Sequence, residues 1–180
     1  MKHLITTLAL SAFALGSAHA AVFQTVVPEK SIVTFSYKQM GVAMDGKFKK
    51  FSAQLNFDPA KADKATGRLD IDLASIDTGS SEADQEVVGK AWFNVAAHPK
   101  ASYVLQSLKP TGPGQYEATG QLTIKGQTRE LRTPLKLNAP STLVGSFVLK
   151  RADFGIGEGL WAKFDVVANE ITVQFTLNLK

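Results

Sequence analysis

The stretch EITVQFTLNLK, residues 170–180, decides the fold class of this sequence. Its apolar residues occupy every second position, and they are Ile171, Val173, Phe175, Leu177 and Leu179. A period of two predicts a β-strand with one face in the protein core and the other face in solvent. Because the same alternation recurs along the chain, the sequence indicates an all-β protein.

Residues 31–39 and 68–73 alternate as clearly as residues 170–180. In the first of these segments Val33, Phe35 and Tyr37 fall on one face, and polar residues fall on the other. Weaker alternation fills residues 47–57, 101–108, 116–124, 128–138 and 143–150. Together these segments predict about eight strands, and their short spacing favours antiparallel pairing.

Turn-forming residues separate the predicted strands at 58–59, 111–114 and 138–141. Lys125-Gly126 lies between two alternating segments, as a tight hairpin requires. One segment departs from the alternation, because Ser81 and Asp84 have the spacing of a capping box. They predict a short helical insertion that runs to about Lys90.

Antiparallel strands with one helical insertion are typical of a closed barrel or a sandwich. The predicted inward positions hold many large aromatic side chains. An eight-stranded barrel is wide enough either to be filled by its own side chains or to hold one slender ligand. Composition alone leaves both alternatives open.

The first twenty residues have the features of a cleaved signal peptide. Lys2 supplies a positive start, a short apolar segment follows at residues 4–15, and Ala18-His19-Ala20 provides the small residues of a cleavage site. A retained membrane anchor would need a longer apolar segment and a basic flank. We therefore expect a signal peptide over residues 1–20, one mature domain over residues 21–180, and a periplasmic location.

Charge and composition argue against several functional classes. Removing Lys2 with the signal leaves 19 basic and 16 acidic residues, without a block of like charge, so we expect no nucleic-acid partner. The chain has no Cys, and His98 is the one His left after cleavage, so we expect no metal site and no covalently attached haem.

The sequence contains no motif that predicts an enzyme. A nucleophile elbow, a phosphate loop and a dinucleotide fingerprint are all missing. Glycine-rich residues 155–159 are interpreted as a loop, and Asp70 and Asp72 as a solvated strand face beside Arg68. Arg151 and Asp153 would share a face of a strand and form a structural ion pair. We therefore predict no catalytic residues.

Several short segments, in order and over nearly all of the mature chain, resemble the YceI-like family. They are SIVTF (31–35), GKF (46–48), FDP (57–59), IDTG (76–79), WFN (92–94) with His98-Pro99, GQLTIKG (120–126) and KRADFGI (150–156). The sequence departs from the family pattern at Gln39, where many relatives carry a His before Met40-Gly41. This departure argues against a family function that would use an imidazole for metal or haem.

The resemblance implies a lipocalin-like antiparallel barrel with an elongated apolar lumen. Members are bacterial, often periplasmic, and bind polyisoprenoids or other long amphiphiles. One branch is associated with cytochrome b561-type membrane proteins, which suggests a polyprenyl quinone as the bound lipid and such a protein as a partner. No other cofactor is expected, and a homodimer is left open.

We expect the lumen wall to contain mainly aromatic and aliphatic side chains, with plain core packing as the alternative for each. The candidates for the wall are Phe35, Tyr37, Phe48, Phe57, Leu69, Ile71, Tyr103, Leu122, Phe147 and Phe175. The candidates that line or cover the entrance are Trp92, Phe93, Phe154 and Trp161. Two other functions stay open: a packed barrel that acts as a protein-interaction or stress-response module, and a periplasmic metal or haem handler.

Overall fold

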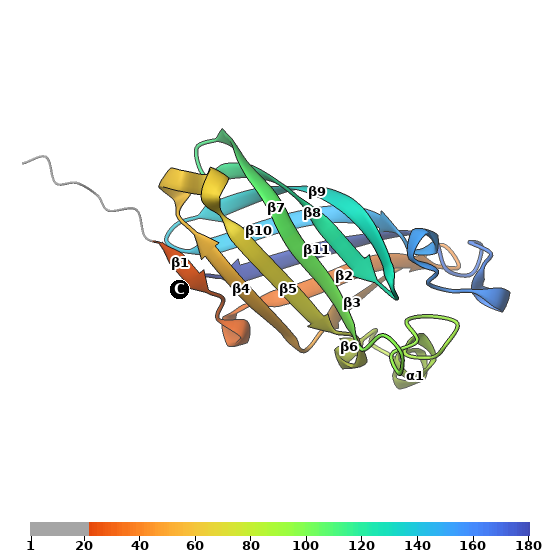
Figure 1. The fold of residues 1–180 in the computed structure, drawn as a ribbon. Coiled ribbons are helices and arrows are strands. Elements are labelled where there is room, and N and C mark those ends of the chain that lie inside the picture. Colours follow the sequence, from red (N-terminus) through yellow and green to blue (C-terminus); the bar gives the residue numbers. More distant parts are fainter. Residues whose placement is uncertain (1–21) are drawn as a thin grey trace, which may run out of the picture.

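The structure, a computed structural model, describes residues 22–180, so the predicted signal peptide and its cleavage site lie outside the described residues. Eleven antiparallel strands form one curled sheet in the order β1-β4-β5-β7-β8-β9-β10-β11-β2-β3-β6 (Figure 1). The all-β antiparallel prediction is confirmed. The expected number of about eight strands was too low. Two short strands, β1 (Phe23–Thr25) and β6 (Ile76–Asp77), also join the sheet, and β3 (Val42–Phe48) is a separate strand before β4.

Apart from β3, of which only the last two residues were predicted, the longer strands agree with the alternating segments of the sequence. They are β2 (Ile32–Gln39), β3 (Val42–Phe48), β4 (Phe51–Phe57), β5 (Thr66–Asp72), β7 (Lys100–Gly112), β8 (Gln115–Ile124), β9 (Gln127–Asn138), β10 (Thr142–Lys150) and β11 (Glu170–Asn178). Short 3-10 helices connect some of them, namely η1 (Pro28–Lys30), η2 (Pro59–Lys64), η3 (Leu73–Ser75), η4 (Arg151–Phe154) and η5 (Gly159–Trp161).

Residues 47–57, predicted as one alternating segment, contain the end of β3 and all of β4. The chain turns between these strands at Lys49 and Lys50, and Ser75 stabilises the turn. The Ser75 carbonyl accepts a hydrogen bond from the Lys49 amide at 3.0 Å, and the Ser75 hydroxyl accepts one from the Lys50 amide at 2.9 Å. Ser75, which is distant in sequence, therefore stabilises a turn inside a segment that alternation alone predicts as one strand.

The predicted helical insertion is α1 (Ser81–Val87), which is shorter than expected. Its N-cap is Ser80, whose hydroxyl accepts a hydrogen bond from the Ala83 amide at 3.4 Å, so the prediction of Ser81 as the cap was wrong by one residue. Asp84 does not complete a capping box, because its carboxylate accepts hydrogen bonds from Thr78 instead.

One end of the curled sheet is closed by β1. Phe23 and Thr25 pair with β4, while the amides of Gln24 and Thr25 donate to the Lys180 carbonyl at 2.8 and 2.9 Å. β1 therefore connects β4 to the residues that follow β11. We call this the closed end.

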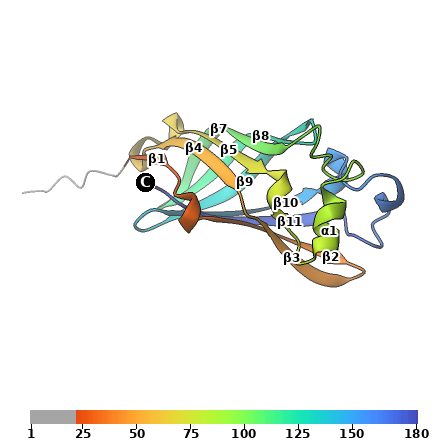
Figure 2. The ribbon, with the colours of Figure 1, turned by 90° about the horizontal axis from the view of Figure 1, so that it is seen from below.

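At the opposite end lie α1, the tip of the β2–β3 hairpin and residues 151–169, as both ribbon views show (Figures 1 and 2). We call it the α1 end. The segments that meet there are irregular, and few backbone ladders join them. Side chains between the two ends fill the inside of the curled sheet only partly, which leaves the cavity described below.

Candidate ligand cavity

A cavity of about 660 Å³ lies inside the curled sheet. Its volume falls within the range of about 300–1,000 Å³ that is usual for small-molecule sites. Strand alternation directs apolar side chains into it from most strands; Phe175 and Leu177 on β11 are two examples. The wall is consequently aliphatic and aromatic over most of its area.

The structure brings nearly all the predicted site residues to this one cavity. Those that line it are Phe35, Tyr37, Phe48, Phe57, Leu69, Ile71, Trp92, Phe93, Tyr103, Leu122, Phe147, Trp161 and Phe175. Phe154 does not line it, because η4 turns the chain out of the sheet there and places the ring in a buried cluster with Ile156. Whether the lining residues contact a ligand stays a prediction.

Sequence reasoning missed the polar residues that border the cavity at the α1 end. They include Gln39, Thr78, Ser80, Glu82 and Glu86. The alternation that identifies the wall carries no information on these residues, since most of them belong to α1 and the loop before it. Gln54, Thr66 and Arg68 border the cavity elsewhere, on β4 and β5.

Two phenylalanine rings lie over glycines of neighbouring strands. Phe35 is paired with Gly46, and Phe175 is paired with Gly145. A Cβ atom on either glycine would overlap the ring of its partner. Because the glycines leave this space, the rings lie across the sheet wall, which helps to keep the middle of the curled sheet unfilled.

Tyr103 lies in the same way against Gly120 of β8. Its hydroxyl is buried and has no hydrogen-bond partner among the described residues. Burial raises the pKa of the Tyr103 phenol to about 12. The hydroxyl therefore stays protonated at neutral pH, as an unused donor on an otherwise apolar wall.

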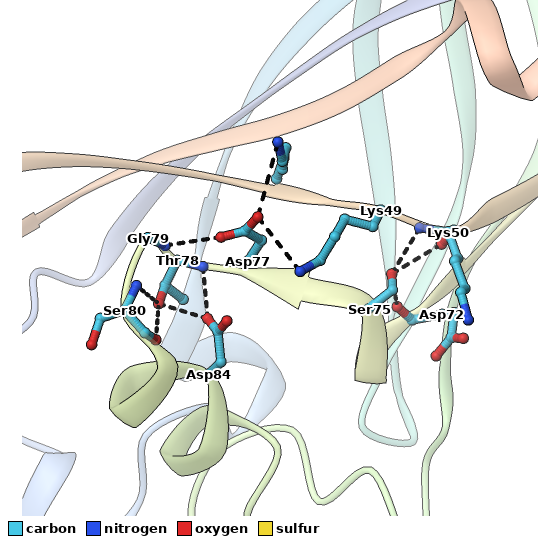
Figure 3. Close-up of polar contacts among 10 residues, drawn as sticks. Lys49, Lys50, Asp72, Ser75, Asp77, Thr78, Gly79, Ser80 and Asp84 are labelled. Atoms are coloured by element: carbon cyan, nitrogen blue, oxygen red, sulfur yellow. Dashed lines mark hydrogen bonds and ion pairs between the residues drawn. The ribbon is translucent and has the colours of Figure 1, made fainter.

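A polar network attaches α1 to the edge of the sheet (Figure 3). The Asp84 carboxylate accepts hydrogen bonds from the Thr78 amide and from the Thr78 hydroxyl, both at 2.7 Å. Asp77 on β6 lies 3.5 Å from Lys49 and 3.9 Å from Lys47. The hydrogen bond from the Gly79 amide is the main cause that lowers the pKa of Asp77, and the two lysines add to it.

Glu86 on α1 connects the helix to two tryptophans that line the cavity. Its Oε1 atom accepts hydrogen bonds from the Trp161 indole at 2.9 Å and from the Trp92 indole at 3.2 Å. The two rings also pack against each other, with centroids 5.3 Å apart. Trp161 belongs to the segment between β10 and β11, so this carboxylate joins two segments across the α1 end.

Arg151 organises the rest of that segment. Its side chain is 1% exposed and donates hydrogen bonds to backbone carbonyls at 2.7–3.2 Å, and the acceptors are Ile156, Gly157, Trp161, Lys163, Val167 and Ala168. The expected ion pair with Asp153 was wrong, since Arg151 begins η4 and not a strand position. Within residues 22–180 it forms no ion pair, and carbonyl dipoles stabilise its charge.

Burial lowers the pKa of Arg151, although a guanidinium remains charged at neutral pH. Its carbon Cζ lies 5.4 Å from the Trp92 ring centroid and 5.2 Å from that of Phe164. Both rings therefore add cation–π attraction to the carbonyl contacts. Since these contacts already use its donors, Arg151 borders the cavity without a free N–H for a ligand.

Two charged residues on β5 beside the cavity form an ion pair. Arg68 is paired with Asp70 at 2.8 Å on β5, and Arg68 also borders the cavity. Within residues 22–180, no three His, Asp or Glu side chains gather closely enough to hold a metal ion. None of the helices in that part of the chain is long and apolar enough to cross a membrane.

Comparison with known proteins gives a consistent result. Residues 24–179 match the model of the YceI-like domain. A UPF0312 protein of Azotobacter vinelandii is 26% identical over 173 residues, which cover 89% of this chain and 90% of that protein.

Two solved structures extend the comparison. The crystal structure of Burkholderia cenocepacia BcnA is 39% identical, with a TM-score of 0.80 and coverage of 84% of this chain and 98% of that chain. A polyisoprenoid binding domain from Saccharophagus degradans is 14% identical, with a TM-score of 0.67 and coverage of 89% and 99%. The second similarity shows the fold alone.

Proposed function

The chain belongs to the YceI-like family, and on that premise we propose that it binds one long-chain amphiphilic lipid in its cavity. The observation that carries the proposal is the apolar cavity of about 660 Å³ inside the curled sheet. We propose a polyisoprenoid, with a polyprenyl quinone as the first candidate. The Saccharophagus degradans domain is a polyisoprenoid binding domain, and polyisoprenoids are the same class of ligand.

The physical basis of binding is the transfer of an apolar tail out of water. Each buried CH₂ group contributes about 0.8 kcal/mol, so a long tail needs few hydrogen bonds. Polar groups at one end of a cavity fix the orientation of an amphiphile. Gln39, Ser80 and Glu82 are such groups here, so we propose that the head group lies at the α1 end.

We propose that the protein acts as a carrier in the periplasm and that a cytochrome b561-type membrane protein is one partner. The cavity supports carriage without catalysis, because apolar side chains predominate in its wall and only a few polar groups lie at its borders. The alternative is a packed module that acts through its surface, and the following experiment separates the two.

Organic extraction of freshly purified protein, followed by mass spectrometry, tests the proposal directly. We expect one long isoprenoid or other long-chain lipid per protein molecule. Added polyprenyl quinone should also raise the free energy of unfolding by about 2.7 kcal/mol when free quinone is at about 100 times its Kd. An extract without lipid, together with no stabilisation by isoprenoid or fatty ligands, would favour the surface module.

A pair of tryptophan variants locates the binding site. Leu122→Trp narrows the cavity and should reduce the retained lipid, although overpacking costs about 1–3 kcal/mol of stability. Val148→Trp is the control, because Val148 is 56% exposed on the outer face of β10. Equal lipid retention by the two folded variants would place the lipid outside the cavity.

A further inference from the structure

An exposed apolar surface lies beside the cavity at the α1 end. It consists of Met40, Val42, Leu160, Phe164 and Val166, which are five of the nine large hydrophobic side chains exposed within residues 22–180. Leu160 is 96% exposed and Met40 is 76% exposed. We call these five residues the apolar tip. Clustered apolar exposure of this kind marks an interaction surface, whereas single exposed residues are ordinary.

The apolar tip is formed by two segments that are joined through their backbones. The Met40 amide donates to the Val166 carbonyl at 2.7 Å, and the Ala168 amide donates to the Lys38 carbonyl at 2.9 Å. Arg151 holds the second segment through the carbonyls of Trp161, Lys163 and Val167. The tip is therefore a preorganised surface and not a collection of loose side chains.

The backbone conformation at Met40 supports a functional role for its exposed side chain. Met40 has a φ of 48°, and with Gly41 it forms the tight turn between β2 and β3. Turns of this kind favour Asn, Asp or Gly at such positions, because a left-handed backbone strains larger residues. A long apolar side chain in a strained and exposed turn lowers stability without contributing to the core, which points to a role outside the folded core.

The tip also continues into the cavity. Trp161 and Val167 line the cavity, and in sequence they alternate with the exposed Leu160 and Val166. A lipid tail that leaves at this end therefore meets apolar side chains on its way out. Lys38, Lys163 and Asp165 are exposed beside the tip, which gives these three groups a net charge of +1. Neither lysine forms an ion pair within the described part of the chain.

We propose that the apolar tip docks on the surface of a lipid bilayer that contains anionic phospholipid, so that lipid passes between bilayer and cavity without crossing water. This inference rests on the proposed function. The apolar side chains enter the interfacial region, while Lys38 and Lys163 face the anionic head groups. The β2–β3 hairpin and residues 155–167 lie at the same end in Figure 2, which suits simultaneous insertion.

Flotation with vesicles tests the docking surface. The vesicles contain phosphatidylcholine with about one quarter phosphatidylglycerol, because lysines close to a membrane surface are attracted to anionic lipid. Two double variants remove apolar contacts from separate segments, Met40→Ser with Val42→Ser and Leu160→Ser with Phe164→Ser. The matched control is Ile32→Ser with Val104→Ser, since both side chains are exposed on the sheet outside the tip.

We expect wild-type protein and the control to float with the vesicles, and each tip variant to lose binding by about tenfold or more. Salt should weaken the binding of wild-type protein. Equal flotation of wild-type and tip variants would overturn the proposal, as would a control that loses as much binding as they do. Circular dichroism confirms that each variant is folded.

Binding of a short-tailed ubiquinone in buffer without vesicles separates this proposal from the proposed function. Tip variants should bind the quinone as wild-type protein does and should transfer it to vesicles more slowly. Quinone binding without wild-type flotation would overturn the docking surface and leave the carrier function standing. A third outcome is that wild-type protein floats, both tip variants fail to float, and none of them binds quinone. That outcome would support the docking surface and overturn the carrier function.

Discussion

The closed end and the α1 end of the curled sheet are held together by different kinds of contact. At the closed end, β1 continues the backbone ladder, and Phe57 packs against Tyr116 and Phe23 with ring centroids 5.3 and 6.1 Å away. At the α1 end, the side chains of Arg151 and Glu86 carry much of the connection. The first end depends on many small contacts and the second on a few strong ones.

This contrast predicts where the molecule opens. A backbone ladder over a packed core unfolds with the whole domain, whereas segments held by a few side chains open locally. We therefore expect residues 155–167 to release their contacts to Arg151 and Glu86 while the strands remain paired. On the proposed function, a lipid would enter and leave through local opening of this kind.

The largest expected effect is the loss of a ring at the closed end. Phe57→Ala removes a side chain that is 3% exposed and should lower the free energy of unfolding by about 3–5 kcal/mol, because a void replaces a packed ring. Denaturant unfolding followed by circular dichroism measures this loss. Phe164→Ala, at the α1 end, is the control and should cost under about 1 kcal/mol. Equal losses in the two variants would remove the distinction between the ends.

A smaller and local effect is expected from Arg151→Met. The substitution leaves carbonyls such as those of Ile156 and Val167 without their donor, but residues 155–167 can open and let water satisfy them. We therefore expect a loss of about 1–3 kcal/mol, confined to that segment. Hydrogen exchange of its backbone amides should accelerate while the amides of β7 and β8 keep their protection.

Arg151→Lys is the matched control for charge. An ammonium group keeps the charge but has three donors and no planar fork, so it reaches fewer of the carbonyls. Its exchange rates should lie between those of wild type and Arg151→Met. If hydrogen exchange accelerates in all strands of Arg151→Met, the α1 end unfolds together with the whole domain, as we expect for the closed end.

The smallest effect is expected from Tyr103→Phe, midway between the ends. The buried hydroxyl has no hydrogen-bond partner among the described residues. Its removal takes away an uncompensated polar group and should raise the free energy of unfolding at neutral pH by about 1 kcal/mol or less. The pKa of about 12 in the folded protein lies above the ordinary value of 10.0, so the folded state binds the proton more tightly than the unfolded state. Relative to its ionised form, the neutral phenol therefore favours folding below pH 10, and this contribution is lost as the pH rises from 10 to 12.

Absorbance of the ionised phenols measures this titration. Wild-type protein should show one tyrosine that ionises near pH 12, and Tyr103→Phe should lack that step and lose less stability above pH 10. If Tyr103→Phe keeps the ionisation step near pH 12 at unchanged size, that step belongs to Tyr37 or Tyr116. Burial also raises the pKa values of these two tyrosines.

Most strands of the sheet could be predicted from the sequence, whereas the α1 end could not. The alternation of Val173, Phe175 and Leu177 is a local property, and it correctly predicted a strand with an apolar face. The family resemblance added the curled sheet around a cavity. Most aromatic residues predicted for the wall do line it, because strand periodicity alone decides which side of the sheet a residue faces.

The α1 end could not be predicted in this way. Arg151 has acceptors between five and seventeen residues away in an irregular segment, and no periodicity connects them. The helix cap was displaced by one residue because Asp84 bonds with Thr78 and not with the helix start. The pairing of Gly145 with Phe175 requires the register of β10 and β11, which follows from the structure and not from either strand alone.

The closure of the sheet by β1 also bears on how the chain folds. Thr25 and Lys180, which share hydrogen bonds there, are 155 positions apart in sequence. Contacts between such distant segments form slowly, because the entropy of loop closure opposes them. Until residues 178–180 meet β1, β1 has β4 as its one partner and its outer edge is open, and an unpaired strand edge is a template for association between chains. We therefore expect the slowest step of folding, and the greatest hazard of aggregation, at the closed end.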